Sequence, residues 1–422
     1  MDTSLDIWIL QTGEPLHCDG DDPRPMRAMN LANSLVSRGH NVTVFSSAFN
    51  HTTKTHRSRQ YQEVVISERL NICLIPSPGY LDHKGLMRLI DHFVMAIRLR
   101  RILNRLQSKP NAIFIGYPPI EVAYVMSNWA RANAIPYVAD VKDQWPHLFV
   151  EALPKFLRWL GRIILSPYFV IGSKTLRGAN SLSAMAGEFL IWSQKFARRD
   201  PTPLDRVFPL SAPKTESSAE QKQLAKSFWL EKKITPGGNK VVFAGTITGS
   251  FDMGPVLEAA RHFREIAQAG GISCDFIFCG VGPYLEDWKT LFAGLENVHF
   301  PGWVEKVELE VLLTWSLAVL VPLRSIPNYT GNIPNKVVDG LANGKPILSG
   351  LRGTLEKLIK TRGVGLHYDD SETTLTDCIT KLIEDKKSLR DIEENCKEVY
   401  RESYDFEHVY KSFVSHLELI AK

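Results

Sequence analysis

Long apolar runs are missing from this 422-residue chain. A helix that crosses a membrane needs roughly 20 consecutive, mostly apolar residues, and no segment provides them. The opening residues, MDTSLDIWIL, are acidic and lead directly into a strand pattern, so they lack the basic and apolar character of a signal peptide. We therefore expect a cytoplasmic protein without membrane-spanning segments.

Cysteine pairs and metal-ligand spacings are also missing. No Cys-x-x-Cys pair occurs, and no spacing resembles that of a zinc site. His51 and His56 are close in sequence, but no carboxylate or third ligand is suitably placed. We expect neither a metal nor another cofactor, and we expect the cysteines to be buried thiols in a reducing compartment. The cysteines are Cys18, Cys73, Cys274, Cys279, Cys378 and Cys396.

Positive charge is concentrated in the first half of the chain. Residues 1–205 contain 24 Lys and Arg against 17 Asp and Glu, a net charge of +7, whereas the remaining residues have a net charge of −3. A basic half favours an anionic partner. Because no groove-like pattern of basic and aromatic residues is present, a membrane surface or a phosphorylated acceptor is a better candidate than nucleic acid.

Short apolar segments alternate with amphipathic segments in both halves, which predicts parallel, doubly wound α/β sheets. The pattern weakens over residues 176–239, which are rich in Pro, Gly and charge, and it restarts at KVVFAG. We therefore predict two Rossmann-like domains that face each other across a cleft, residues 1–205 and 206–400. No tandem repeat is visible, which argues against a solenoid.

Two glycine-containing loops in the second half follow predicted strands, at the ends where open α/β sheets bind ligands. They read FAGTITGSFDMG and FCGVGP, and such loops can bind a phosphate through backbone N–H groups. Ordinary strand–helix turns would explain each loop equally well. The candidate contacts are Gly245, Thr246, Thr248, Gly249, Gly280 and Gly282.

The most informative segment is VPLRSIPNYTGNIPNKVVDGLANGKPILSG. A buried strand delivers Arg324 at its carboxyl end, and Pro334 begins a helix after a polar loop. Lys336 and Asp339 are three residues apart, so they share one helix face. This arrangement suits a diphosphate and a ribose, and the alternative is a surface ion pair between the two side chains.

The segment IPNKVVDGLANGKPIL resembles the donor-site signature of the family 4 retaining glycosyltransferases of GT-B fold. In the second half, the segments FAGTITG, FCGVGP and VPL occur in that family's order and spacing. In the first half, the loop from QTGEP to RPMR resembles the family's glycine loop and first helix. The segment YVADVKDQWP resembles its Asp-x-x-Asp-x-Trp-Pro segment. The likeness covers nearly the whole chain and is greatest to bacterial O-antigen and capsule enzymes. It implies a UDP-sugar bound by the second domain and a last helix, residues 401–422, that returns to the first.

Three departures from the family pattern concern the donor. The carboxylate that contacts the ribose is usually Glu and is Asp339 here, and a second Glu eight residues earlier is replaced by Gly331. Backbone N–H groups from Gly331 through Asn332 to Ile333 are expected to supply that contact. The family's Arg–Lys phosphate clamp is absent as well.

Two threonines replace that clamp, so Lys336 and Arg324 are expected to neutralise the diphosphate. Glycosyl transfer passes through an oxocarbenium-like state while the diphosphate leaves. Cations and helix amino termini would stabilise the leaving charge without a metal. The resemblance implies that the anomeric configuration is retained, with attack on the face that the leaving group vacates.

The first half supplies the expected acceptor side. Gly13 would let the backbone approach the donor phosphate, as the resemblance implies. Asp140 and Asp143 follow a strand, and a carboxylate there would orient the acceptor hydroxyl or stabilise the reacting sugar; we assign this role to Asp143, with a turn-capping aspartate as the alternative. Other acceptor-side candidates are Glu14, Arg24, Arg27 and His51.

Two basic and apolar stretches fit a membrane surface. Residues 84–109 contain seven Lys and Arg against one acidic residue, Asp91, with an apolar stripe at helical spacing, and LPKFLRWLGRIILSPYFV is the second stretch. Peripheral attachment to the inner face of the cytoplasmic membrane through residues 84–106 is one prediction, and packing of the stripe on the sheet is the alternative. The stripe comprises Leu86, Leu89, Ile90, Phe93, Ile97 and Ile102.

Two other functions are compatible with the same residues. One is a nucleotide-sugar 2-epimerase of this fold, which needs no acceptor. The other is a non-catalytic nucleotide-sugar-binding protein, which Gly331 favours and the intact Lys336, Asp339 and Asp143 disfavour.

Overall fold

The computed structural model describes residues 4–20, 25–81, 86–211, 217–369 and 372–422. The chain forms two compact units: unit 1 is Met1–Pro209 with Glu407–Lys422, and unit 2 is Leu210–Phe406. These limits lie within a few residues of those proposed from the sequence. Both units are α/β with parallel sheets, which confirms the predicted fold class. No helix among the described residues is long and apolar enough to span a bilayer.

Unit 1 is built on an eight-stranded sheet of order β10-β9-β8-β7-β1-β2-β6-β5, in which only the edge pair β5–β6 is antiparallel. Its strands are β1 (Asp6–Leu10), β2 (Asn41–Ser47), β5 (Gln62–Ser67), β6 (Leu70–Ile75), β7 (Ala112–Tyr117), β8 (Tyr137–Val141), β9 (Ser181–Ala184) and β10 (Arg206–Val207). A small hairpin pairs β3 (Phe49–Asn50) with β4 (Thr55–His56). The central strand β7, AIFIGY, is buried along its whole length, as expected for a parallel strand covered on both faces.

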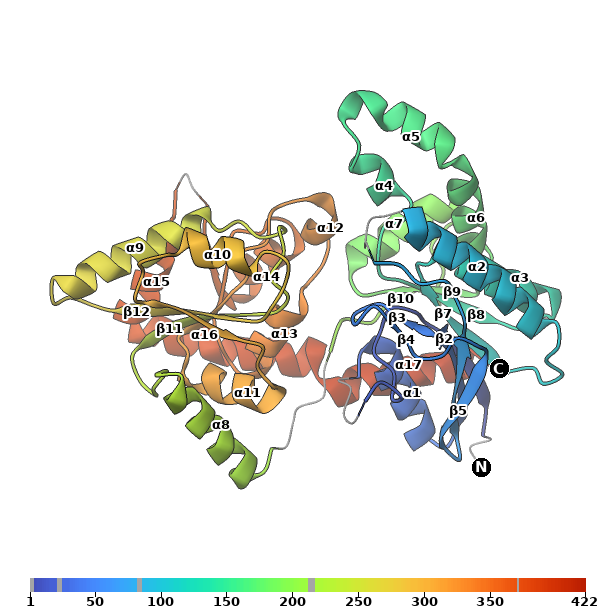
Figure 1. Ribbon diagram of the computed structural model, residues 1–422, viewed down its shortest axis with the longest axis horizontal. Coiled ribbons are helices and arrows are strands. Elements are labelled where there is room, and N and C mark those ends of the chain that lie inside the picture. Colours follow the sequence, from blue (N-terminus) through green and yellow to red (C-terminus); the bar gives the residue numbers. More distant parts are fainter. Residues whose placement is uncertain (1–3, 21–24, 82–85, 212–216, 370–371) are drawn as a thin grey trace. The chain divides into compact units, whose positions relative to one another are not determined.

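Helices cover both faces of this sheet (Figure 1). One face carries α1 (Arg27–Ser37) and α17 (Phe406–Ile420), and the other carries α2 (Leu86–Leu103), α3 (Ile120–Ala132) and α6 (Ser166–Arg177). The remaining helical segments of unit 1 are α4 (His147–Glu151), η1 (Lys155–Leu157), α5 (Arg158–Ile164) and α7 (Gly187–Ala197). The final helix of the chain therefore completes the fold of its first segment.

A buried guanidinium ties several segments of unit 1 together. Arg27, at the start of α1, donates to both carboxylate oxygens of Asp140 on β8, at 2.8 and 2.7 Å, and to the carbonyl of Phe208 at 2.7 Å. Its guanidinium also lies 4.9 Å from the centre of the Phe413 ring on α17. Burial alone would raise the pKa of Asp140, but the charge and hydrogen bonds of Arg27 hold it below its ordinary value.

Unit 2 has a six-stranded, fully parallel sheet of order β13-β12-β11-β14-β15-β16. Numbered from its first strand, this is 3-2-1-4-5-6, the order of dinucleotide-binding folds. The strands are β11 (Asn239–Ala244), β12 (Cys274–Cys279), β13 (Val298–Gly302), β14 (Ala318–Leu320), β15 (Ile347–Ser349) and β16 (Gly365–His367).

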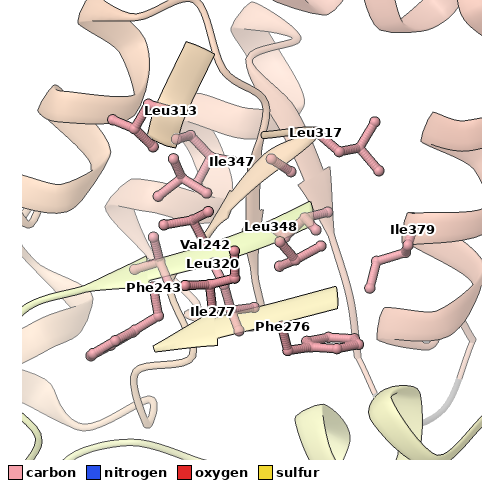
Figure 2. Close-up of a cluster of buried hydrophobic side chains, with 14 of the residues drawn as sticks. Val242, Phe243, Phe276, Ile277, Leu313, Leu317, Leu320, Ile347, Leu348 and Ile379 are labelled. Atoms are coloured by element: carbon pink, nitrogen blue, oxygen red, sulfur yellow. The ribbon is translucent and has the colours of Figure 1, made fainter. Parts of the chain in front are cut away.

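Apolar side chains from both faces of this sheet form the core of unit 2. Figure 2 shows strand residues such as Val242 and Leu320 beside Leu313 and Ile379 from the covering helices. The helical segments are α8 (Ala219–Glu231), α9 (Gly254–Gln268), α10 (Leu285–Leu291), α11 (Lys306–Trp315), α12 (Pro327–Thr330), α13 (Asn335–Ala342), α14 (Thr354–Arg362), α15 (Leu375–Glu384), α16 (Lys386–Val399) and η2 (Tyr400–Tyr404).

Replacing Asp140 with Asn tests the buried pair. The change leaves the Arg27 charge without its counter-ion inside the protein, which costs about 3–5 kcal/mol when one partner of a buried pair is removed. We expect a marked destabilisation of unit 1 in denaturant unfolding. Asp143→Asn, three residues later and partly exposed, is the matched control and should cost under about 1 kcal/mol. Equal shifts in the two variants would show that the pair contributes no more than an ordinary polar contact.

Candidate functional site

The order of the strands in unit 2 creates a switch point between β11 and β14. Chain connections leave these neighbouring strands in opposite directions, so the loops at their carboxyl ends diverge and open a crevice. The loop after β11 begins at Gly245, and the segment after β14 leads through Arg324 to α13. The sequence-predicted donor residues therefore converge on the position where this type of sheet binds nucleotides.

The glycines of the two short loops allow the loops to contact each other. A β-carbon on Gly280 would lie 2.0 Å from the carbonyl oxygen of Gly245, and one on Gly282 would lie 2.1 Å from that of Ile247. The Gly245 N–H donates to Cys279 O at 3.0 Å, which continues the pairing of β11 with β12 beyond the strand ends. Their first role is thus close backbone packing, which the sequence does not reveal.

The loop after β11 is also tied to the segment after β14. Phe251 forms an isolated antiparallel bridge with Leu323, and the Ser250 hydroxyl lies 2.8 Å from the Tyr329 hydroxyl. Arg324 is exposed, and its Nε donates to the carbonyl of Phe251 at 3.1 Å. Arg324 therefore braces the loop that follows β11, a contact that the sequence analysis did not predict.

The hydroxyls of that loop differ in exposure. Thr246 is exposed, whereas Thr248 is half-buried and its Oγ1 accepts from the Ser250 N–H at 3.4 Å. Gly249 is exposed and packs against the ring of Tyr284, since a β-carbon there would lie 2.8 Å from that ring. Only the Thr246 hydroxyl is thus presented openly to a ligand.

Lys336 has the most unusual environment in this part of the molecule. From the first turn of α13, its Nζ lies 4.1 Å from the centre of the Phe243 ring and 4.4 Å from that of Phe251, both buried. A β-carbon on Gly245 would be 3.4 Å from this Nζ. Burial lowers the pKa of Lys336 to about 7, and the negative charge of Asp339 only partly opposes that effect.

Asp339 lies one turn further along α13 and is half-buried. Its negative charge acts on Lys336 and partly offsets the effect of burial on the pKa of that lysine. The helix itself is fixed firmly: a β-carbon on Gly340 would come within 2.7 Å of a methyl group of Ile347 on β15. The helix therefore holds its first turn against the sheet edge.

Two of the three backbone N–H groups predicted to contact the donor at residues 331–333 have acceptors within the chain. The Asn332 N–H donates to the carbonyl of Tyr329 at 3.2 Å, and the Ile333 N–H donates to Asn332 Oδ1 at 2.8 Å. These two N–H groups therefore have acceptors within the chain, in the turn that follows the short helix α12. For Asn332 and Ile333 this differs from the expectation that they face the donor.

Unit 1 contains a cavity of about 260 Å³ at the carboxyl ends of its central strands. It brings together four predicted residues, which are Gly13, Glu14, His51 and Asp143. Further lining residues that the sequence reading did not assign to a site are Tyr80, Arg88, Asp91, His92, Lys142 and Trp145. The polar residues Arg88, Asp91 and His92 recur at helical spacing within α2. This pattern in the sequence could have indicated that one face of the helix lines a polar cavity.

Glu14 and Asp143 have different situations in this cavity. Glu14 accepts from the Ala28 N–H at the start of α1, at 2.9 Å, and from the ammonium of Lys142. It therefore fixes the loop to the helix and is already satisfied. Asp143 is half-buried and lines the cavity directly.

The imidazoles of the cavity are held by aromatic neighbours. His51 Nδ1 lies 2.5 Å from the Tyr80 hydroxyl. His92 is buried, and burial together with the nearby Arg88 lowers its pKa to about 3. His92 is accordingly neutral at physiological pH. The same cavity is lined by the basic residues Arg88 and Lys142 and by the acidic residues Glu14, Asp91 and Asp143.

Two acceptor-side candidates need correction or lie outside the structure. Arg27 was expected to meet an acceptor phosphate, but its guanidinium is fully engaged by Asp140 and Phe208 in the interior. Asp140 is likewise structural, whereas Asp143 lines the cavity. Arg24 lies outside the described residues. In the parts of the chain that the structure describes, no three His, Cys, Asp or Glu side chains group as metal ligands do.

Comparisons with known proteins agree with this architecture. The chain is similar to the solved sucrose-phosphate synthase of Thermosynechococcus elongatus, with 12% identity, a TM-score of 0.70 and 99% of each chain covered. It is also similar to HepE of Anabaena in complex with UDP-glucose, with 13% identity, a TM-score of 0.66, and 98% of this chain and 100% of that one covered.

A third similar structure is WaaG, described as a glycosyltransferase involved in lipopolysaccharide biosynthesis, with 14% identity, a TM-score of 0.64, and 98% of this chain and 99% of that one covered. These likenesses show the GT-B fold of two Rossmann-like domains. No curated protein matches the sequence. Residues 238–385, which hold the switch-point loops, Lys336 and Asp339, match the family model described as glycosyl transferases group 1.

Proposed function

We propose that the chain is a retaining glycosyltransferase of family 4 that transfers a hexosyl or N-acetylhexosaminyl group from a UDP-sugar. The observation that carries the proposal is the Lys336 ammonium, held over Phe243 and Phe251 beside Gly245 at the switch point of unit 2. Burial disfavours the charge of Lys336 and Asp339 offsets that effect only in part, so an anionic ligand at this position would stabilise the ammonium. The match of residues 238–385 to the group 1 glycosyl transferases supports the same reading.

The donor diphosphate would lie against Lys336 and the exposed Thr246, with Arg324 reinforcing the loop that follows β11. Negative charge grows on the diphosphate as the sugar departs, so Lys336 would stabilise the transition state more than the ground state. Asp339 would accept hydrogen bonds from the ribose hydroxyls. The complex of HepE with UDP-glucose favours uridine as the base to test first.

The acceptor would be a glycan or a lipid-linked glycan of surface polysaccharide biosynthesis. The cavity of unit 1 supports this assignment, since it combines Asp143 with the cation Arg88 and with aromatic rings. Asp143 would orient the acceptor hydroxyl, and Arg88 suits a phosphate of the acceptor. The name of WaaG is consistent with an acceptor of this class.

A thermal-shift screen of nucleotide sugars tests the donor. A ligand at 100 times its dissociation constant stabilises the protein by about 2.7 kcal/mol. Incubation of the stabilising sugar without an acceptor then separates the functions: an epimerase would convert it, a transferase would need an acceptor, and a binding protein would do neither.

The ribose contact is tested at Asp339. Asp339→Asn removes a charge-assisted hydrogen bond that contributes about 1.5–3 kcal/mol, so donor affinity should fall roughly 10- to 100-fold. Asp339→Glu restores the common family residue and should retain appreciable activity. Asp287→Asn, an exposed carboxylate on α10, is the control and should leave affinity unchanged. Unaltered donor affinity in a folded Asp339→Asn protein would overturn the assignment.

The lowered pKa of Lys336 predicts how donor binding depends on pH. The free enzyme holds Lys336 with a pKa of about 7, and bound diphosphate would raise that pKa. Affinity for UDP-glucose should therefore be pH-independent below about pH 7 and fall by up to tenfold per unit above it. The sugar nucleotide is the proper probe, because its diphosphate is esterified at both ends and does not titrate in this range.

Calorimetric titration between pH 6 and 9 measures this slope. The Lys336→Met variant should bind UDP-glucose more weakly than wild type, and its affinity should not depend on pH. The Lys336→Arg variant stays charged over this range, so it should still bind UDP-glucose, and its affinity should not depend on pH either. A slope that persists in Lys336→Met would assign the titration to another group.

Turnover should survive removal of divalent metal ions. The proposed charge stabilisation relies on Lys336 and helix amino termini, so EDTA should change the rate by less than about twofold. A complete loss of activity that Mg²⁺ restores would contradict this part of the proposal.

A further inference from the structure

A segment of unit 1 exposes several large apolar side chains together. They belong to η1 and α5, which follow α4 at the edge of the helical layer (Figure 1). Phe156 is 74% exposed, Trp159 64% and Ile164 66%, and Ile163 and Leu160 are also exposed. An exposed cluster of this kind is rare on a soluble surface and marks an interaction site.

The charged residues of the same segment are all basic. Between residues 155 and 177, across η1, α5 and α6, no Asp or Glu occurs. The cations are Lys155, Arg158, Arg162, Lys174 and Arg177. Among the described residues none of these five forms an ion pair within the chain, so their charge is available to a partner. We call residues 155–177 the basic apolar face.

A hollow of about 490 Å³ adjoins this face between α6 and α7. Its floor is aromatic: Trp192 and Phe196 stack with centroids 5.0 Å apart, and His147 packs edge-on against both. Two cations of the face, Lys174 and Arg177, line it with Lys195 and Arg198 of the α7 end, whereas no carboxylate does. The hollow therefore combines an apolar floor with a positive rim.

We infer that the basic apolar face and the adjoining hollow dock on the surface of an anionic phospholipid bilayer. Apolar side chains enter the boundary between headgroups and acyl chains, while the surrounding Lys and Arg meet lipid phosphates. A second copy of this chain is disfavoured, because a two-fold contact would bring like charges together. Exposed isoleucines likewise find no partner on nucleic acid. The inference concerns a surface separate from the donor residues and does not depend on the proposed function.

Helix α2 was the membrane-binding segment predicted from the sequence, and the structure gives it two apolar faces. Met95 and Leu99 are buried, whereas Leu86, Ile90, Phe93 and Ile97 of the predicted stripe are exposed. The alternative that this stripe packs on the sheet is therefore wrong, and membrane attachment through it stays a prediction. Its cations, however, cluster near its carboxyl end and Arg88 is turned into the cavity of unit 1. The face on α5 and α6 carries apolar and basic groups together, so we assign the principal contact there.

Vesicle flotation with the full-length protein tests the assignment. Wild-type protein should float with vesicles of phosphatidylcholine and phosphatidylglycerol and not with phosphatidylcholine alone. The double variant Arg158→Gln, Arg162→Gln should reduce partitioning about 30-fold, at about fivefold per cation. Trp159→Glu and Ile163→Glu, both at exposed positions, should each reduce it at least about tenfold.

Matched controls change exposed apolar residues elsewhere. Val65→Glu on the edge strand β5 and Trp303→Glu in unit 2 should leave partitioning within about twofold of wild type. Phe93→Glu on α2 should have a smaller effect than Trp159→Glu. Each variant should bind the nucleotide sugar as wild type does in the thermal-shift assay. This second measurement distinguishes a failure of the membrane inference from a failure of the donor proposal.

Three outcomes would overturn the inference. The first is equal, negligible flotation of wild-type protein with both vesicles. The second is binding that Phe93→Glu abolishes and Trp159→Glu leaves intact, which would move the contact to α2. The third is a dimer in sedimentation velocity that Trp159→Glu dissociates without any vesicle binding, which would make the face a contact between copies.

Discussion

The buried charge of Arg27 is the constraint on which unit 1 depends. A guanidinium removed from water needs a counter-ion and acceptors, and Asp140 and the Phe208 carbonyl supply them from segments distant in sequence. A second pair reinforces the first, because Glu14 caps the same end of α1 and accepts from Lys142, two residues after Asp140. Together the pairs fix the loop after β1 to the loop after β8. Gly13 and Asp143 consequently line one cavity.

Unit 2 places a cation where its own fold disfavours the charge. Phe243 and Phe251 attract the Lys336 ammonium through their ring faces, yet they also exclude the water that would stabilise it. In the proposed function an anion would therefore meet a side chain that its neighbours already hold in place. The close packing of Gly280 on Gly245 and of Gly340 on β15 keeps both walls in place.

The sequence allowed the fold class to be predicted from local periodicity, and the spacing of Lys336 and Asp339 allowed their place on one helix, α13, to be predicted. It could not distinguish Asp140 from Asp143, since only tertiary contacts show which carboxylate meets Arg27. It did not reveal that the N–H groups of Asn332 and Ile333 have acceptors within the chain, since this depends on the turn that follows α12. The mixed character of α2 escaped prediction because one stripe can pack while another faces outward.

The return of α17 to unit 1 has a consequence for how the molecule is made. Unit 2 is a continuous stretch, Leu210–Phe406, whose core can close as soon as it has left the ribosome. Unit 1 is discontinuous: Phe413 stacks on Phe208 with ring centroids 3.9 Å apart, and His416 lies 2.9 Å from the Ser181 hydroxyl. The first half of the chain to be synthesised is therefore the last to complete its core, and it must be kept from aggregating with the Arg27 pocket open until the final helix emerges.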